Sequence, residues 1–256
     1  MDIKDFEKSI YKELGINLSA YKPTQLHRRI DSLMGRLGIK SLDEFLVKIK
    51  TDSNIKQRFL DFITINVTEF NRNPDIFNQF EKIVKDEFLD KNKKMKIWSA
   101  ACSIGCEPYS VAMFLKEQGA SLYEHTIIAT DIDKTALKKA KEGIYTDIEM
   151  KNILSSTLKK YFKTVGDKYY IDDSIKKMVQ FKQHDLILNS YEGDFDIIIC
   201  RNVVIYFNSD VKDNIYRNFT KSLKKGGLLF VGATESIYNY KEYGLEKAST
   251  FIYKKV

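Results

Sequence analysis

Small and polar residues follow the apolar runs of this chain, at positions where a parallel sheet would bring them together. The run MKIWSA continues into SAACSIGCEP, which is rich in small residues, and HTIIATD ends on Asp131. DFDIIIC is followed directly by Arg201 and Asn202. In a doubly wound sheet, ligands bind at the carboxyl ends of the strands, where the strand order reverses. These residues are therefore the first candidates for a binding site.

Each of these strand ends suits one part of an adenosine-type ligand. Small residues let a backbone approach a ligand closely and leave amides free at a helix N-terminus. Asp131 can accept hydrogen bonds from ribose hydroxyls of either NAD or S-adenosylmethionine. Asp185, in the segment HDL, can accept a hydrogen bond from an adenine amino group. Taken singly, each of these features also fits a tight turn or a solvated loop. The sequence has no GxGxxG motif, so a dinucleotide pyrophosphate is not clearly indicated.

Strands and helices alternate through most of the chain after residue 76. This alternation predicts a parallel sheet covered by helices on both faces, an α/β fold of Rossmann type. YFKTVGDKYYIDD and KKMVQFKQHDL interrupt it, with a Gly-Asp turn at residues 166–167. We predict a small antiparallel β-subdomain here, at about residues 161–184.

The first 65 residues show only helical spacing of apolar residues. The segment NVTEFNRNP then breaks the helical pattern. We therefore predict an all-α N-terminal domain at 1–65, a linker at 66–75 and an α/β domain at 76–256.

Composition and charge narrow the class of protein. The 256 residues are 43% hydrophobic and 30% charged, typical of a globular chain, and the net charge of +7 suits an acidic partner or simply a lysine-rich surface. The three cysteines indicate neither a disulfide framework nor a zinc site. The N-terminus resembles no targeting peptide, and no apolar run approaches the roughly 18 residues needed to cross a bilayer. We expect a cytoplasmic protein without a metal.

Six segments together resemble the CheR family of chemotaxis receptor glutamate methyltransferases. They are NVTEFNR, WSAACSIGCEPYS, ATDIDKTALKKAKEGIY, HDL, CRNVVIYF and GGLLFVGATES. Their order, spacing and residue types agree with those of the family over essentially the whole chain. The resemblance implies a Rossmann-type methyltransferase domain using S-adenosylmethionine, preceded by a small all-α domain and carrying an antiparallel β insert.

The resemblance also implies which residues contact the cofactor. The matching positions are Asn66, Thr68, Arg72, Glu107, Asp131, Asp185, Leu186, Asn202 and Val203. The first three lie in an NxTxFxR linker that closes over the cofactor in that family. This chain departs from the family at Asn71, where a second Phe is common, at Cys106, where GEEPYS has its first Glu, and at GATES, which replaces GHSES.

Methylation of a glutamate side chain needs no general base. Its pKa is near 4.3, so the carboxylate is ionised at neutral pH, and the enzyme has only to align it about 3–3.5 Å from the methyl carbon. Arg72 could hold the carboxylate by a bidentate pair, although a salt bridge to the helical domain is the structural alternative. Tyr206 matches a family tyrosine beside the methyl group. We expect Arg72 and Tyr206 to be the catalytic residues.

The expected partners are methyl-accepting chemotaxis receptors, methylated in their cytoplasmic helical region. S-adenosylhomocysteine is the expected second product. The basic helix around Arg28, Arg29 and Arg36 fits docking on an acidic receptor helix, or is a solvated face. The turn VGD lacks the Gly-rich expansion associated with tethering to a receptor tail, which leaves tethering open. We expect a monomer, recruited to membrane receptors, that neither binds nucleic acid nor inserts into the membrane.

Three other functions fit parts of the sequence. An RNA or small-molecule methyltransferase would suit the pI near 9.0, but no basic stripe interleaved with aromatic residues is present. A sensor that binds the cofactor without catalysis would not need Arg72 and Tyr206. A nicotinamide oxidoreductase would be expected to carry GxGxxG.

Overall fold

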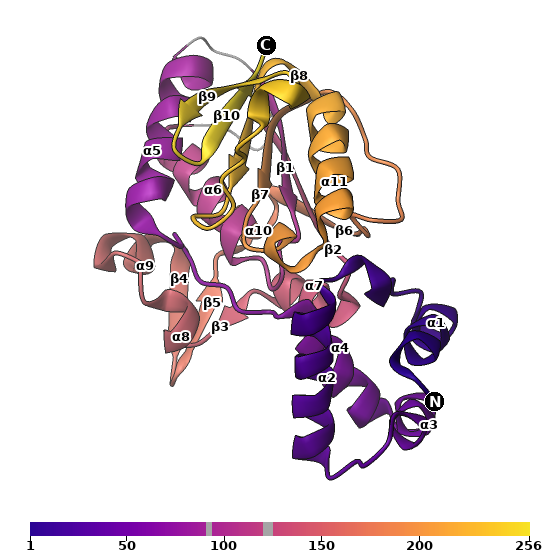
Figure 1. The fold of residues 1–256 in the computed structure, drawn as a ribbon. Helices are drawn as coiled ribbons and strands as arrows, with labels where there is room; N and C mark the ends of the chain where they lie inside the picture. The colour runs from indigo at the N-terminus through magenta and orange to yellow at the C-terminus, as the bar shows by residue number, and fades with distance from the viewer. Residues whose placement is uncertain (91–93, 120–124) are drawn as a thin grey trace. The chain divides into compact units, whose positions relative to one another are not determined.

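The chain forms two compact units, seen in a computed structural model that describes residues 1–90, 94–119 and 125–256 (Figure 1). The first unit comprises Met1–Asn66 and Tyr206–Asn214, and the second comprises Val67–Ile205 and Ile215–Val256. The helical unit therefore contains a segment, residues 206–214, that lies far away in the sequence. None of the helices in the described ranges combines the length and apolar content needed to cross a bilayer.

The first unit is helical, as predicted. Its elements are α1 (Ile3–Leu14), η1 (Leu18–Ala20), α2 (Pro23–Leu37), α3 (Leu42–Thr51) and α4 (Ser53–Thr64). Three fully buried rings form its centre: Phe45 stacks on Phe6 with centroids 5.8 Å apart, and Phe59 meets both edge-on. Amphipathic helices this short depend on such packing for their stability.

The returning segment joins this unit through backbone hydrogen bonds. The N–H of Lys22 donates to the carbonyl of Tyr206 at 2.9 Å, and the N–H of Asn208 donates to Ala20 at 2.9 Å. The rings of Tyr21 and Phe207 meet edge-on, 5.1 Å apart. The start of α11 (Ser209–Ser222) thus belongs to the helical unit.

The second unit is built on a seven-stranded sheet in the order β6-β2-β1-β7-β8-β10-β9. Its strands are β1 (Met95–Ala100), β2 (His125–Asp131), β6 (Val179–Gln183), β7 (Phe195–Cys200), β8 (Leu223–Val231), β9 (Leu245–Ser249) and β10 (Ile252–Lys255). The first five pair in parallel, and β9 and β10 add an antiparallel edge. The strand order reverses between β1 and β7, so their carboxyl ends form the switch point where a ligand is expected.

Helices cover both faces of this sheet (Figure 1). They include α5 (Pro74–Val84), which runs into a π-helical turn η2 (Lys85–Leu89), α6 (Cys106–Glu117), α7 (Lys134–Glu142) and α11. On one face, Phe80 of α5 stacks on Phe230 of β8 with centroids 4.8 Å apart. On the other, Phe219 of α11 meets Trp98 of β1 edge-on at 5.4 Å. Burial on both faces explains why β1 and β7 are almost continuously apolar.

The β insert differs from its predicted extent. A separate antiparallel sheet has the order β3-β5-β4, from β3 (Ile144–Tyr145), β4 (Phe162–Val165) and β5 (Lys168–Ile171), with α8 (Asp147–Met150), α9 (Ser155–Tyr161) and α10 (Asp173–Lys176) around it. The predicted turn at residues 166–167 joins β4 to β5. The prediction that the insert continues to residue 184 was wrong, because β6 pairs in parallel with β2 in the large sheet. A short apolar run does not reveal which distant strand it will pair with.

Replacing Phe80 by alanine should show how much the packing of α5 contributes. Phe80 is fully buried, so we expect Phe80→Ala to lower the free energy of unfolding by about 3–5 kcal/mol, measured by urea denaturation. Tyr238 is 93% exposed, and Tyr238→Ala should change it by less than about 0.5 kcal/mol. An unchanged unfolding midpoint in Phe80→Ala would contradict this packing.

Candidate functional site

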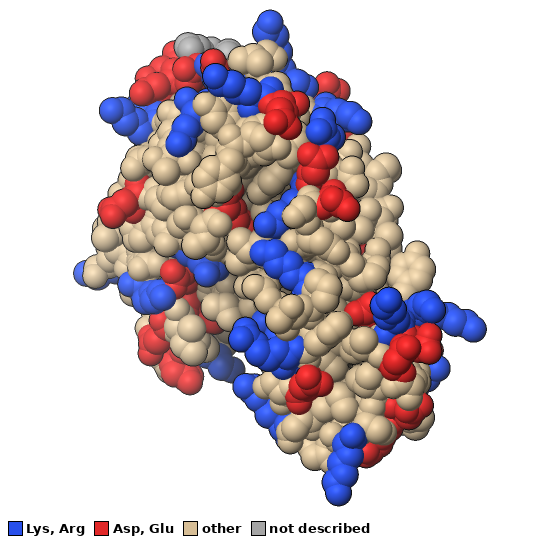
Figure 2. All heavy atoms as spheres, in the orientation of Figure 1, with Lys and Arg blue, Asp and Glu red and all other residues tan. Residues whose placement is uncertain are grey.

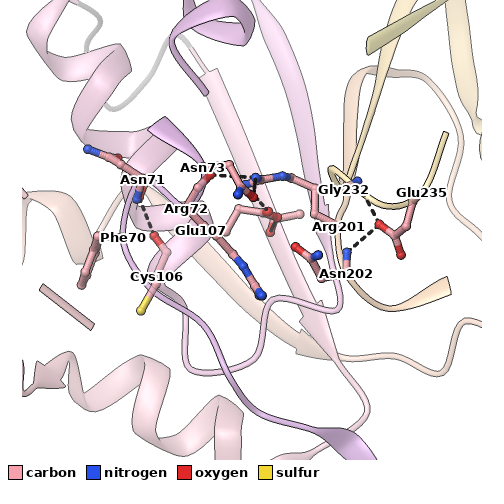
Figure 3. Close-up of polar contacts among 12 residues, drawn as sticks. Phe70, Asn71, Arg72, Asn73, Cys106, Glu107, Arg201, Asn202, Gly232 and Glu235 are labelled. Atoms are coloured by element: carbon pink, nitrogen blue, oxygen red, sulfur yellow. Dashed lines mark hydrogen bonds and ion pairs between the residues drawn. The ribbon is translucent and has the colours of Figure 1, made fainter. Parts of the chain in front are cut away.

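A buried arginine lies at the switch point of the sheet. Arg201 follows β7 directly and is 7% exposed. Its Nη2 donates to the carbonyl of Arg72 at 2.7 Å and to Oδ1 of Asn73 at 3.1 Å, and its Nη1 lies 3.6 Å from Oε2 of Glu107 (Figure 3). This side chain therefore joins the segment before α5, the start of α6 and the end of β7.

Glu107 is the acidic partner of this arginine. It lies in the first turn of α6, where a carboxylate is favoured by the helix dipole, and its Oε1 accepts a hydrogen bond from Ser99 Oγ at 2.8 Å. Burial raises the pKa of Glu107, while the charge of Arg201 and the Ser99 hydrogen bond act in the opposite direction. The charge of Arg72 also lowers the pKa of Glu107, so this second guanidinium lies within electrostatic reach.

Asp131 closes the turn between β1 and α6. Its carboxylate accepts hydrogen bonds from the N–H groups of Ser103, at 2.7 Å, and Asp133, at 2.9 Å. Burial raises the pKa of Asp131 to about 6, although these backbone hydrogen bonds favour the ionised form. Gly105 has φ of 88°, and a Cβ there would lie 3.0 Å from Ala140, so this turn needs the small residues that the sequence places in it.

The loop after β6 lies next to Asp131. The N–H of His184 donates to the carbonyl of Asp131 at 3.0 Å. Asp185 accepts hydrogen bonds from Ile187, at 2.7 Å, and Leu188, at 3.3 Å, so its carboxylate shapes its own loop. Leu186 is buried, and its carbonyl accepts a hydrogen bond from the Tyr191 hydroxyl.

The loop after β7 is held by a carboxylate that was not among the predicted site residues. Glu235 accepts a hydrogen bond from the N–H of Asn202 at 2.6 Å (Figure 3). It accepts a second from the N–H of Val203 at 2.9 Å. Asn202 has φ of 61°, and its Oδ1 is buried without a hydrogen-bond partner among the described residues. The only sequence signal for Glu235 was its place in GATES, after the strand LLFV.

The linker supplies Thr68 and Arg72 to the second unit. Nη1 of Arg72 donates to the carbonyl of Val67 at 3.0 Å. A hydrogen bond from Thr68 lowers the pKa of the Cys106 thiol, but burial is the larger effect and raises it well above its usual value. Cys106, one of the departures from the family, is thus a buried thiol beside the linker.

The remaining two predicted residues belong to the first unit. Asn66 donates from Nδ2 to Oγ1 of Thr64 at 3.0 Å. Tyr206 ends the 3-10 turn η3 (Val204–Tyr206), and its carbonyl accepts the hydrogen bond from Lys22. Within the second unit, contacts link Arg72, Glu107, Asn202 and Val203 through Arg201 and Glu235, while Asp131 and Asp185 lie on adjoining loops.

Comparison with known families agrees with this architecture. Residues 1–64 match the CheR methyltransferase all-alpha domain, and residues 66–252 match the CheR methyltransferase SAM binding domain. The chain belongs to the CheR methyltransferase family. It is 38% identical to the chemotaxis protein methyltransferase of Listeria monocytogenes, over 98% of this chain and 95% of that protein. It is 34% identical to that of Borreliella burgdorferi, over 97% and 92%.

Family membership confirms the predicted fold class and cofactor. This CheR protein is a methyltransferase that uses S-adenosylmethionine. A solved TehB-like SAM-dependent methyltransferase from Corynebacterium glutamicum shares 15% identity with it over 69% of this chain and 92% of the other, with a TM-score of 0.39. The assignment rests on the family matches rather than on that likeness.

The residues at the strand ends fit this cofactor. The buried Oδ1 of Asn202 is an acceptor that lacks a partner among the described residues, and S-adenosylmethionine carries an ammonium and hydroxyl groups that can donate. Both oxygens of Asp131 accept hydrogen bonds from backbone N–H groups, and a carboxylate offers about four acceptor positions, so room is left for a ribose hydroxyl. Both groups flank the switch point, as the fold requires.

Cofactor affinity should depend on pH through Asp131. Its folded pKa, about 6, lies above the usual value of 3.8, so the folded protein binds a proton that the unfolded chain would not bind until lower pH. Binding that needs the ionised carboxylate is therefore complete well above pH 6 and lost below it. We expect the affinity for S-adenosylhomocysteine, measured by calorimetry, to approach a fall of about tenfold per pH unit below 6.

Two variants provide the comparison. Asp131→Asn should bind weakly at pH 7.5 and show little further loss at pH 5.5. Asp196, another buried acid, accepts a hydrogen bond from Lys96 near the start of β7, and Asp196→Asn should keep the wild-type pH dependence. An Asp131→Asn protein with the same pH dependence as the wild type would show that another group titrates.

Proposed function

We propose that this CheR protein transfers a methyl group from S-adenosylmethionine to glutamate side chains of chemotaxis receptors. The products would be glutamyl methyl esters and S-adenosylhomocysteine. The names of the Listeria monocytogenes and Borreliella burgdorferi relatives support a role in chemotaxis. The proposed acceptor is the cytoplasmic helical region of the receptors, so the reaction would take place in the cytoplasm.

The proposal of a carboxylate substrate is supported by the few interactions that the guanidinium of Arg72 makes within its unit. Its guanidinium uses Nη1 for the carbonyl of Val67 and makes no ion pair with the described residues of its unit. A guanidinium presents five N–H donors in a fork that matches a carboxylate. Arg72 therefore keeps the donors needed to bind an incoming glutamate by a bidentate, charge-assisted pair.

For this reaction the protein has mainly to align the glutamate carboxylate with the methyl group. S-adenosylmethionine, when bound, supplies an electrophilic methyl group. The glutamate is already ionised at neutral pH, which removes the need for a proton acceptor. Arg72 would orient the carboxylate, and partial exclusion of water would strengthen that pair.

We assign Tyr206 to the same step. It follows Ile205, whose N–H donates to Glu235 at 3.3 Å, so the backbone leading to the tyrosine is held. Its hydroxyl would donate a hydrogen bond to the glutamate or line the path of the methyl group. We assign the cofactor contacts to nine residues. They are Asn66, Thr68, Arg72, Glu107, Asp131, Asp185, Leu186, Asn202 and Val203.

The charge of the helical unit suggests how a receptor could dock. Arg28 and Arg36 of α2 are exposed, although the guanidinium of Arg36 also lies 5.7 Å from the centre of the Phe62 ring. An acidic receptor helix would be attracted to both arginines. Arg29 is instead a packing residue: its guanidinium donates to the carbonyl of Phe62 and lies 4.6 Å from that ring, and burial lowers its pKa. The docking face is therefore smaller than the sequence predicts.

Figure 2 shows basic and acidic side chains side by side over much of this face, together with a narrow run of Lys and Arg side chains down its middle. On this face the net charge of +7 is not gathered into one broad basic field. A broad field of that kind is the electrostatic feature expected of nucleic-acid binding.

Removing the Arg72 side chain should largely abolish methyl transfer. We expect Arg72→Ala to lose at least about 100-fold in turnover at saturating cofactor, because the glutamate loses a charge-assisted pair. Turnover is measured as base-labile methyl incorporation into receptors. Arg58→Ala, which removes an exposed arginine of α4, is the matched control and should retain full activity. Wild-type turnover in Arg72→Ala would remove this residue from the mechanism.

Reversing the charge of the docking face should slow methylation in a salt-dependent way. We expect Arg28→Glu/Arg36→Glu to reduce receptor methylation at least fivefold at low salt and less at high salt, because screening shortens the range of the attraction. Lys12→Glu/Arg58→Glu changes the net charge equally elsewhere on the same unit and should have a smaller effect. Equal effects of the two double variants would show that docking does not use α2.

A further inference from the structure

Glu235 accepts hydrogen bonds from four backbone N–H groups, and none of the roles assigned so far accounts for them. Its Oε2 accepts from the N–H groups of Asn202, at 2.6 Å, and Gly232, at 2.8 Å. Its Oε1 accepts from Val203, at 2.9 Å, and Ile205, at 3.3 Å. One carboxylate thus joins the end of β8 to the loop that follows β7.

This carboxylate is inside the protein. Glu235 is 4% exposed, and burial raises its pKa while the four backbone hydrogen bonds lower it. A buried charge is tolerated only when its hydrogen-bonding capacity is used. The four N–H groups would in turn be left unsatisfied if the carboxylate were removed. The loop and Glu235 therefore depend on each other.

The loop needs such a restraint because its backbone is unfavourable. Asn202 adopts φ of 61°, in the left-handed region that non-glycine residues rarely enter. Its N–H is held by Glu235, and its Oδ1 is buried without a partner among the described residues. The direction of that side-chain acceptor is therefore set by the hydrogen bonds of its own backbone.

Gly232 makes room for this arrangement. A Cβ at this position would lie 2.5 Å from Oε2 of Glu235 and 2.8 Å from the nitrogen of Asn202. Both distances are shorter than real Cβ contacts. Any side chain here would push the carboxylate away from the N–H groups that it binds.

We propose that Glu235 is a positioning residue that holds the loop at residues 202–205 so that Asn202 is directed at the cofactor, with Gly232 providing the space. The proposal rests on the assignment of Asn202 to the cofactor site. Both oxygens of Glu235 are used by backbone N–H groups, so we assign it no direct contact with the cofactor or the methyl acceptor. It acts through the backbone of the loop, and the same restraint fixes the chain up to the residue before Tyr206.

The test measures binding of S-adenosylhomocysteine by calorimetry, next to the thermal unfolding temperature of each variant. Glu235→Gln replaces one carboxylate oxygen by an amide that cannot accept, which opposes two of the four N–H groups. We expect its affinity for S-adenosylhomocysteine to fall at least tenfold. Gly232→Ala displaces the carboxylate by a different route and should give a loss of similar size. If Glu235→Gln does not fold, Gly232→Ala carries the same test.

Asp196→Asn is the matched control for general destabilisation. Asp196 is also buried and accepts a backbone hydrogen bond, from Lys96 at 2.8 Å, but near the other end of β7. It should lower the unfolding temperature without changing affinity more than twofold. A loss of affinity in Asp196→Asn equal to that in Glu235→Gln would overturn the proposal, as would wild-type affinity in Glu235→Gln and Gly232→Ala.

A double-variant cycle separates positioning from stability. If Glu235 acts through Asn202, then Glu235→Gln should cost less than threefold in affinity when Asn202→Ala is already present. Fully additive losses would overturn that route. Because S-adenosylhomocysteine is bound without any methyl acceptor, a failure to find receptor esters would refute the proposed function and leave this cycle unaffected.

Discussion

A guanidinium buried at the centre of the sheet determines the geometry of this site. Moving a charge out of water is costly unless it is paired and hydrogen-bonded. The two Nη atoms of Arg201 meet that requirement with Glu107, with the carbonyl of Arg72 and with Asn73, while its buried Nε has no hydrogen-bond partner among the described residues. The guanidinium also lies 4.6 Å from the ring of Phe230. Its partners come from different segments, so none of these segments can shift without leaving part of the charge unpaired.

Two buried carboxylates have different roles near that cation. Glu107 balances the guanidinium, and Glu235 satisfies backbone N–H groups. Burial raises the pKa of both, while the oxygens of Glu107 interact with Ser99 and Arg201 and those of Glu235 accept backbone hydrogen bonds. This agrees with a reaction whose nucleophile is already ionised. The buried charges of Glu107, Arg201 and Glu235 therefore stabilise the positions of the segments around the site.

Backbone strain is concentrated in the same region. Asn71, Asn73, Ala101, Ser103 and Asn202 all have positive φ without being glycine. Such conformations persist only where the surroundings hold them, and they cluster at functional sites. Hydrogen bonds to Ser110, Asp131 and Glu235 hold three of these residues. The strain is thus matched by specific side-chain acceptors.

Local pattern predicted the all-α first unit and the alternation of strands and helices in the second, but it missed the short helices α8, α9 and α10 of the insert. It was weakest where pairing between distant strands decides the structure. The segment SDVKDNIYRNFTKSLKKGG predicts a helix with Ser209 as its N-cap and Gly226 just past its end. In the structure α11 ends at Ser222, and Leu223 already begins β8 by pairing with Phe195. In the same way β6 joined the large sheet instead of the insert. Lysines and glycines give no local sign of a partner strand.

The sequence alone determined the chemistry available at the strand ends. Asp131 and Asn202 could be selected because parallel strands bring their carboxyl ends to one edge, a rule that needs only the order of elements. Asp185 was selected from the segment HDL and the family resemblance, because the strand before it was not predicted to lie in the parallel sheet. Tertiary structure alone decided that Glu235 reaches back across 33 residues to Asn202, and that Arg29 packs on Phe62. Hydrogen bonds between distant segments depend on three-dimensional position, which no local spacing encodes.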